Sequence, residues 1–276
     1  MTLEILDAAG AVLRRYSSND PTTPTAEELR TNLIPPYWPK INGPLPVTAG
    51  MHRWVWDLRA TAPASPHYDY PISAVPGRTP LTPQGPTVLP GTYTVRLTVD
   101  GHSETQPLTV KMDPRIPTSP ADLETLHAAE VAVCSAFDAI SKADLAAHSV
   151  QEQLAAPENA ALAAQLAPYT AALKKLLTGA GAEGDRQEGQ MAGIDAITGA
   201  AGQVYGELDQ SDEAPTEALL AAAATVEKES AEAGPAWEDF EAKQLPAIND
   251  LLRKAGRPAI NPTKAATDMP DSGDED

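Results

Sequence analysis

The chain has 276 residues, 42% of them hydrophobic, which allows one large domain or two of ordinary size with packed cores. Its formal net charge of −18 opposes binding to phosphate backbones and anionic lipid, so a nucleic-acid partner is not expected. A single cysteine, Cys134, excludes an internal disulfide framework and any multi-cysteine metal site. Because no apolar run of about 18 residues occurs, no transmembrane segment is predicted, and membrane association would require a partner.

The composition changes near Arg115. Residues 1–115 contain 10 acidic and 10 basic residues and 17 of the 27 prolines, whereas residues 116–276 carry the whole net charge. Prolines also follow Asp113 closely, and each proline disfavours helix in the residue before it. We therefore predict a β-rich domain at 1–115, an α-helical domain at 116–260, and a disordered acidic tail at 261–276.

Two β-hairpins are predicted in the first domain. The first joins Thr2–Leu6 to Ala11–Tyr16 through a short turn that contains a glycine. The second joins Pro90–Val99, in which apolar and polar residues alternate, to His102–Lys111 through Asp100-Gly101. An antiparallel arrangement follows from both turns.

A further strand is predicted at Met51–Arg59, where Trp54, Trp56 and Leu58 share one face. Two proline-rich stretches, 19–50 and 60–89, are too long for ordinary hairpin loops and are expected to be insertions. Five to seven short strands with such loops are typical of a small antiparallel β-sandwich.

The second domain shows the apolar periodicity of amphipathic helices. Ser119-Pro120-Ala121-Asp122 has the residues of a helix start, with a capping hydroxyl, a first-turn proline and an acidic residue. Four helical stretches with turn residues between them predict an antiparallel bundle of about four helices, the last broken or kinked at Pro235 and Pro246. The apolar faces are Leu126, Val133, Ile140, Ala147 and Leu154; Leu162 to Leu177; Met191 to Leu208; and Leu219, Ala223, Val226, Ser230, Ala233, Trp237, Phe240, Leu245, Ile248 and Leu252.

The usual signatures of enzyme chemistry are missing from the sequence. Its five histidines, at positions 52, 67, 102, 127 and 148, show no metal-ligand spacing of the His-Glu-x-x-His kind. Neither a nucleophile elbow nor a phosphate-binding loop nor a dinucleotide fingerprint occurs. We therefore assign no catalytic, metal or cofactor-binding residues and expect the chain not to be an enzyme.

Aromatic residues gather in and beside the long loops, and these are the candidate ligand or partner contacts. Aromatic faces next to a carboxylate are typical of sugar-binding surfaces. Two structural alternatives remain open: Trp54 and Trp56 can form the sandwich core, while the two tyrosines at 68 and 70 can pin the loop. The candidates are Tyr37, Trp38, His67, Tyr68, Asp69 and Tyr70.

Five segments resemble, in this order, the region that follows the β-propeller in bacterial sortilin-like, BNR/Asp-box repeat proteins, which are often labelled glycosyl hydrolases. They are Leu3–Gly10, Arg53–Arg59, Leu89–Gly101, Val110–Arg115 and Leu245–Gly256. The resemblance implies an Ig-like sandwich followed by helices, and a periplasmic or extracellular setting, although no signal peptide is predicted. The propeller and its Asp-box motif are absent, so no catalytic residue carries over.

These observations favour a non-catalytic structural or protein-interaction module that acts as an accessory subunit of a larger assembly. The alternative is a carbohydrate-binding accessory domain of a propeller-type glycoside hydrolase system. In that alternative Trp38, Tyr68 and Tyr70 stack on sugar rings and Asp69 accepts hydroxyl hydrogen bonds. A third hypothesis, an enzyme using His52, His67 and Asp69, rests on proximity in sequence alone.

Overall fold

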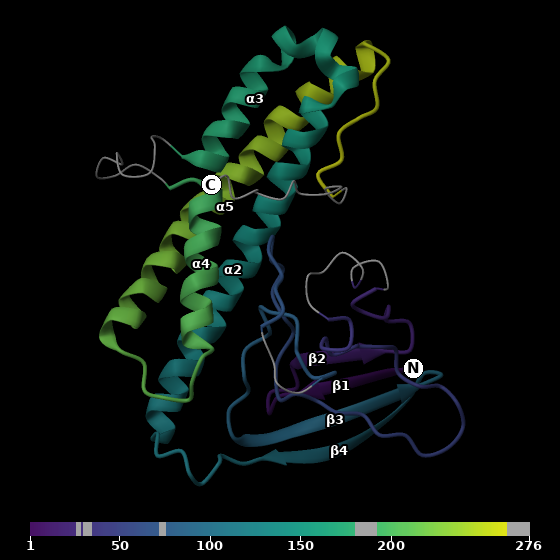
Figure 1. The fold of residues 1–276 in the computed structure, drawn as a ribbon, viewed down its shortest axis with the longest axis vertical. Helices are drawn as coiled ribbons and strands as arrows, with labels where there is room; N and C mark the ends of the chain where they lie inside the picture. Colours follow the sequence, from purple (N-terminus) through teal and green to yellow (C-terminus); the bar gives the residue numbers. More distant parts are fainter. Residues whose placement is uncertain (26–28, 30–34, 72–75, 180–191, 264–276) are drawn as a thin grey trace. The chain divides into compact units, whose positions relative to one another are not determined.

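The computed structural model describes residues 1–25, 29, 35–71, 76–179 and 192–263 (Figure 1). The chain divides into two compact units, which we name the sheet unit and the helical unit. The sheet unit is Met1–Pro63, His67–Cys134 and Gly206–Glu217, and the helical unit is Ala64–Pro66, Ser135–Tyr205 and Ala218–Asp276. The helix α2, Pro120–Ala155, contributes residues to both units. The predicted boundary at residue 116 stays a prediction, and most of the predicted tail lies outside the described residues.

The sheet unit contains one antiparallel sheet with the strand order β2-β1-β3-β4 (Figure 1). Both predicted hairpins are confirmed: β1 (Thr2–Leu6) pairs with β2 (Val12–Ser17), and β3 (Gly91–Val99) pairs with β4 (His102–Val110). The second turn has φ angles of 49° at Asp100 and 83° at Gly101, the left-handed conformation that a two-residue hairpin turn requires.

Strands β1 and β3 join the two hairpins, although about ninety residues separate them in sequence. Leu3 lies opposite Leu97 and Ile5 opposite Val95, so apolar residues of both strands share one face. On the other face the Arg96 guanidinium donates a 2.8 Å hydrogen bond to the Glu4 carboxylate. This pairing therefore aligns the apolar faces of both hairpins.

A small apolar core covers part of that face. Ile5, Val88 and Tyr93 are buried, and Trp56 packs against them with its ring centroid 5.7 Å from that of Tyr93. The Trp56 indole donates a 2.8 Å hydrogen bond to the Arg59 carbonyl. The segment around Trp56 thus forms a second layer over the sheet.

The prediction of a strand at Met51–Arg59 is wrong. Residues 51–58 have no strand pairing, and Leu58 has a φ of 61°, a left-handed conformation that interrupts an extended chain. Arg59 forms only an isolated bridge with Thr87. Within the described residues one sheet is present, and the second sheet of the predicted sandwich is not among them.

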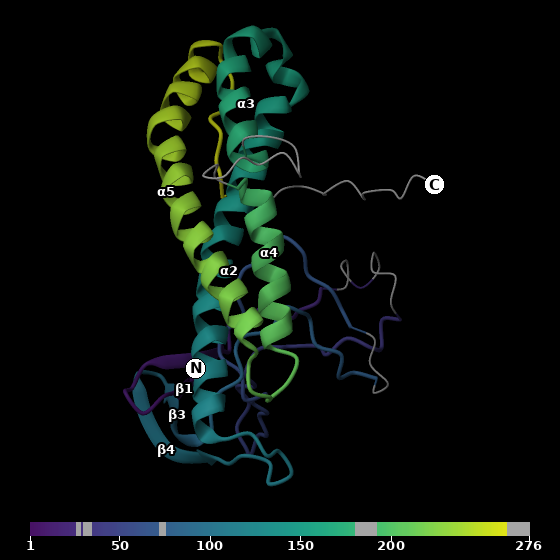
Figure 2. The ribbon, with the colours of Figure 1, turned by 90° about the vertical axis from the view of Figure 1, so that its left-hand side faces the viewer.

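The helical unit contains α2 from Ser135 onward, α3 (Ala163–Thr178), α4 (Ile194–Leu208) through Tyr205 and α5 (Glu217–Lys254) from Ala218 onward. A short 3-10 turn, η1 (Pro157–Leu162), connects α2 to α3. Figures 1 and 2 show α3 and α4 following one another in the same direction, alongside α2 and α5. The helices therefore form three rows, namely α2, α5, and α3 followed by α4. The prediction that every successive helix runs antiparallel to the one before it is wrong for α3 and α4.

Two glycines permit the close approach between the end of α3 and the start of α4. A Cβ built on Gly193 would lie 2.2 Å from the Leu177 carbonyl oxygen, and one on Gly179 would lie 2.6 Å from the Gly193 nitrogen. Gly179 and Ala192 also form a backbone bridge. Because any side chain would collide there, this contact requires glycine.

The apolar face predicted for α5 is confirmed residue by residue from Ala223 to Leu252, since all nine positions are buried. Of the break or kink predicted at Pro235 and Pro246, the break does not occur, because α5 runs through both prolines as one helix, drawn as a curved ribbon in Figure 2. Each proline removes one backbone hydrogen bond. The buried residues on either side, including Trp237 and Phe240 with stacked rings 5.8 Å apart, hold the helix together.

Candidate functional site

The loop residues predicted as contacts lie on segments that flank residues 77–82. The Tyr37 carbonyl accepts a 2.8 Å hydrogen bond from the Gly77 N–H, and the Trp38 carbonyl accepts one of 3.1 Å from the Thr79 N–H. The rings of Tyr37 and Trp38 meet edge to face at 6.5 Å, and Tyr37 is exposed. This half of the predicted set is therefore anchored through its backbone.

The other half of the predicted set is anchored to the same segment from a second loop. Asp69 and Thr82 exchange both backbone hydrogen bonds, at 3.0 and 2.9 Å. The Tyr68 hydroxyl donates to the Pro63 carbonyl at 3.4 Å, and His67 is exposed. Tyr70 is half-buried, and its N–H donates to the Asp69 carboxylate. The structure thus links Tyr37, Trp38 and Asp69 directly to residues 77–82, and the other three predicted residues are neighbours of Asp69 in the chain.

Of the six, only Tyr68 lines the described cavity in this unit. The cavity has a volume of about 150 Å³, and its charged walls are Arg14, Lys40, Asp57 and Arg59. Pockets that enclose a small-molecule ligand usually measure about 300–1,000 Å³. A sugar would therefore lie on the surface beside Tyr68 and not inside this cavity.

An acidic pair lies elsewhere in the sheet unit: Glu130 on α2 is buried, and Asp209, directly after α4, is half-buried. The Glu130 carboxylate accepts a 3.1 Å hydrogen bond from the Thr87 N–H, and Arg59 donates to both Asp209 and the Gly85 carbonyl. Burial raises the pKa of Asp209 to about 6, Arg59 opposes that rise, and the charge of Glu130 adds to it. These contacts fasten loops of the sheet unit to α2.

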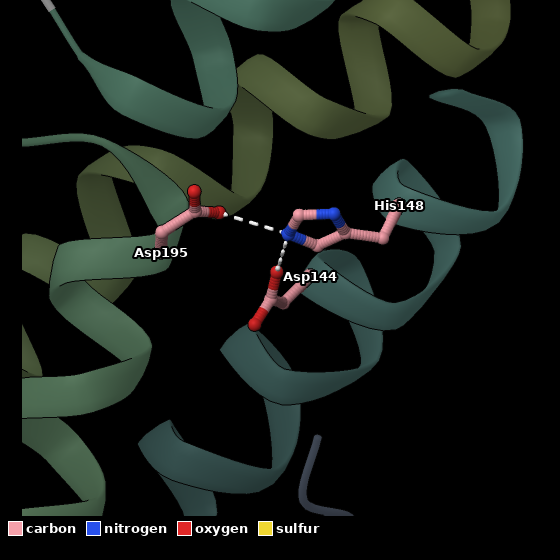
Figure 3. Close-up of side chains that lie close together, drawn as sticks. All are labelled: Asp144, His148 and Asp195. Carbon is pink, nitrogen blue, oxygen red and sulfur yellow. Dashed lines mark hydrogen bonds and ion pairs between the residues drawn. The ribbon is translucent and has the colours of Figure 1, made fainter. Parts of the chain in front are cut away.

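The helical unit contains the one group of described residues that converges like a ligand-binding site. On α2, Asp144 and His148 lie four residues apart and therefore on one helix face. Asp195 lies in the first turn of α4. Figure 3 shows both carboxylates directed at the same imidazole nitrogen, and we name these three residues the Asp-His-Asp cluster.

The imidazole Nε2 of His148 lies 3.2 Å from Asp144 Oδ1 and 3.2 Å from Asp195 Oδ1. The close approach of Asp144, followed by that of Asp195, raises the pKa of His148 to about 10. Asp144 is only 5% exposed, while the side chains of His148 and Asp195 are 31% and 44% exposed. The cluster is therefore deep at Asp144 and open to solvent at the other two residues.

Asp144 Oδ1 is a buried oxygen that accepts no hydrogen bond from any described residue. Its contact with Nε2 is an ion-pair distance without hydrogen-bond geometry, whereas Asp195 has a hydrogen bond. Nε2 carries at most one proton, so one N–H cannot serve both carboxylates well. The arrangement leaves Asp144 Oδ1 with an ion pair but no hydrogen bond.

The spacing between histidines does not indicate this cluster, because the cluster contains a single histidine. The Asp-x-x-x-His spacing of Asp144 and His148 was the available signal, since it places both side chains on one helix face. Asp195 lies 47 residues beyond His148, and no local pattern connects the two.

Two of the histidines considered for chemistry make only local contacts. His52 Nε2 lies 2.6 Å from the Thr48 carbonyl oxygen on its own loop, and His127 approaches Glu130, one helical turn away, at 3.9 Å. Neither is part of the Asp-His-Asp cluster.

Comparisons with known protein families, with curated proteins and with solved structures found no match. Within the described residues, none of the helices combines the length and the apolar composition needed to cross a membrane.

Proposed function

We propose that this chain is a non-catalytic protein-interaction module, an accessory subunit of a larger assembly. One observation carries the proposal: twelve of the thirteen large apolar side chains that are exposed among the described residues belong to the sheet unit. Where such side chains are neighbours, an exposed apolar patch is typical of a surface that binds another protein. The twelve are Val12, Tyr37, Ile41, Val47, Met51, Val55, Leu58, Tyr68, Leu97, Val99, Leu108 and Val131.

The best-defined part of this surface is the uncovered end of the sheet. Leu97 and Val99, which lie toward the turn of the second hairpin, project from the same face of β3 as Tyr93. The core covers Tyr93, whereas Leu97 and Val99 are exposed. We name these two residues the sheet-end patch. A partner that covers it would extend the existing core.

The partner would dock on the face of the sheet and not along the edge of β4. The two-residue turn makes Val99 and His102 a hydrogen-bonded pair, so alternate residues of β4, including Pro107, direct their backbone outward. Proline has no N–H to donate to an added strand. Pro107 therefore interrupts the free edge and disfavours strand addition.

The finer description of the fold is part of the same proposal. The Trp56 segment occupies the layer where a sandwich would have its second sheet, which supports an Ig-like arrangement with an irregular second layer. Four helices that share a buried core support the description as a helical bundle. The likeness to the post-propeller region of BNR/Asp-box repeat proteins also remains a proposal.

The alternative, a carbohydrate-binding accessory domain, is favoured by one observation. Tyr37 and Tyr68 expose their rings on two loops that are both held by residues 77–82. Exposed, anchored aromatic rings are suited to stacking on sugar rings.

The test is affinity capture of the tagged chain from its own cells, with Leu97→Glu as the variant and Leu145→Glu as the matched control. Leu97 is 39% exposed and Leu145, on the helical unit, is 40% exposed, so the two substitutions change equal surfaces. We expect a stoichiometric protein partner that Leu145→Glu retains and Leu97→Glu loses.

Three results would count against the interaction module. Equal capture by both variants would contradict the placement of the surface, and turnover of any glycoside by the purified chain would contradict a non-catalytic role. Glycan binding that Tyr68→Ala abolishes, with no protein partner, would establish the alternative.

A further inference from the structure

We propose that Asp144, His148 and Asp195 bind a divalent transition-metal cation of the Zn²⁺ class. The site lies in the helical unit and does not depend on the interaction surface proposed for the sheet unit. One imidazole nitrogen and two carboxylate oxygens form its donor set, and their atoms all lie within 4.8 Å of one another.

Two of the three separations between the donor atoms match the requirements of such a cation. With metal–ligand bonds of about 2.1 Å, neighbouring ligand atoms lie about 3.0 Å apart in an octahedral site and about 3.4 Å apart in a tetrahedral one. The two Nε2–oxygen distances are both 3.2 Å, between these values. The third separation, between the two carboxylate oxygens, is at most 4.8 Å, and the exposed side chain of Asp195 can rotate to bring it into the same range.

The unsatisfied oxygen of Asp144 is the second, independent observation. Only 5% of Asp144 is exposed, and its Oδ1 accepts no hydrogen bond from the described residues. A buried carboxylate oxygen that accepts no hydrogen bond costs free energy, even beside an ion-pair partner. Figure 3 shows this oxygen directed at Nε2, toward the space that a cation would occupy.

A single proton on Nε2 cannot form good hydrogen bonds with both carboxylates, whereas a cation can bind both. The proton forms one hydrogen bond, with Asp195, and leaves Asp144 with an ion pair at the same 3.2 Å but without hydrogen-bond geometry. A divalent cation accepts electron pairs from all three atoms at once. It also balances the two carboxylate charges in full.

The helices hold the three ligands rigidly. Asp144 and His148 are one turn apart on the 36-residue helix α2, and Asp195 is in the first turn of α4. The glycine contact between Gly179 and Gly193 holds the start of α4 against the end of α3. Ligands on packed helices keep their separations better than ligands on loops do.

The donor set also indicates the class of cation. Imidazole nitrogen suits Zn²⁺ and its first-row neighbours, whereas Ca²⁺ and Mg²⁺ prefer sites made only of oxygen. Three protein ligands leave at least one coordination position, and the exposed sides of His148 and Asp195 open it to water. The bound cation would therefore keep an exchangeable position.

The experiment is titration of the full chain, treated with chelator, with Zn²⁺ by calorimetry and with Co²⁺ by visible absorption. About 0.15 M salt and excess Mg²⁺ suppress weak association of cations with the strongly acidic chain. We expect one saturable site, and Co²⁺ bands that show coordination to nitrogen and oxygen.

The variant is Asp195→Asn, whose side chain is largely exposed and whose replacement is nearly isosteric, so the fold should persist. The matched control is Asp239→Asn, an exposed carboxylate on α5 that pairs with Lys243. We expect Asp195→Asn to weaken Zn²⁺ binding by about tenfold or more and Asp239→Asn to leave it unchanged.

His148→Gln provides a second readout, because losing the imidazole ligand should shift and weaken the visible d–d bands of Co²⁺. The proposal is overturned if no saturable site is found, or if Asp195→Asn and Asp239→Asn bind Zn²⁺ equally. Neither result affects partner capture by the surface around Leu97. Failure of the metal-site proposal is therefore distinguishable from failure of the proposed function.

Discussion

The two units bury their apolar side chains to different degrees. In the helical unit the helices pack their apolar faces together, and Leu145 is its one exposed large apolar side chain among the described residues. The sheet unit, which contains most of the prolines, covers only part of one sheet face and exposes twelve such side chains. Amphipathic helices bury their apolar stripes against one another, whereas proline-rich loops lack the donors and the periodicity to form a second sheet.

The largest effect is expected in the core of the helical unit. Leu173 on α3 is fully buried, so Leu173→Ala removes packed methyl groups and leaves a cavity. We expect the free energy of unfolding to fall by about 2–5 kcal/mol, measured by urea denaturation with far-ultraviolet circular dichroism. Leu145→Ala, the exposed control, should change it by less than about 0.5 kcal/mol. Similar losses in both variants would contradict the difference in burial.

The next effect tests whether the Trp56 segment is a true second layer. Trp56→Ala removes the ring that packs on Tyr93, and we expect a loss of about 2–3 kcal/mol, less than for a fully buried tryptophan. Hydrogen exchange of the β1 and β3 amides is the measurement, because it reports the stability of the sheet locally. Trp56→Phe should retain most of the protection. Unchanged exchange in Trp56→Ala would show that the segment adds little to the sheet unit.

A pH effect of intermediate size is expected from Asp209. Its pKa is raised in the folded state to about 6, so the folded state binds the proton more tightly than the unfolded state does. The contribution of Asp209 to stability is therefore complete below about pH 4 and is lost as the pH rises through about 6. We expect a loss of about 1 kcal/mol, because the group is partly exposed and Arg59 screens it.

The measurement is urea denaturation at a series of pH values for the wild type and Asp209→Asn. The variant cannot titrate at this position, so its stability should fall less between pH 4 and 7. Parallel profiles for the two proteins would contradict the raised pKa.

The smallest effect on stability is expected at the sheet-end patch. Leu97→Ser should change the free energy of unfolding by less than about 0.5 kcal/mol, because Leu97 is already exposed to water in the isolated chain. Partner capture should nevertheless fall, as proposed for Leu97→Glu. A large loss of stability would instead place Leu97 in the core of the sheet unit.

Features that depend on nearby residues were predictable from the sequence. The buried face of α5 follows from the 3.6-residue period, and it was predicted at each position from Ala223 to Leu252. Both hairpins follow from glycine-containing turns between alternating strands, as at Asp100-Gly101. In each case the signal lies within one helix or one turn.

Features that depend on distant residues were decided by the tertiary structure. Local alternation predicted a strand around Trp56, but that segment packs as an irregular layer over the paired strands β1 and β3. Turn residues suggested a reversal after α3, yet the contact between Gly179 and Gly193 lets α4 continue in the same direction.

The Asp-His-Asp cluster combines both kinds of information. Helix periodicity, which is readable from the sequence, places Asp144 and His148 on one helix face, because a helix repeats every 3.6 residues. Only the tertiary structure brought Asp195 within 3.2 Å of His148, because packing of α4 on α2 sets that distance and no sequence pattern encodes it. Local hydrogen bonding thus determined the elements, and long-range burial of apolar faces decided which side chains meet.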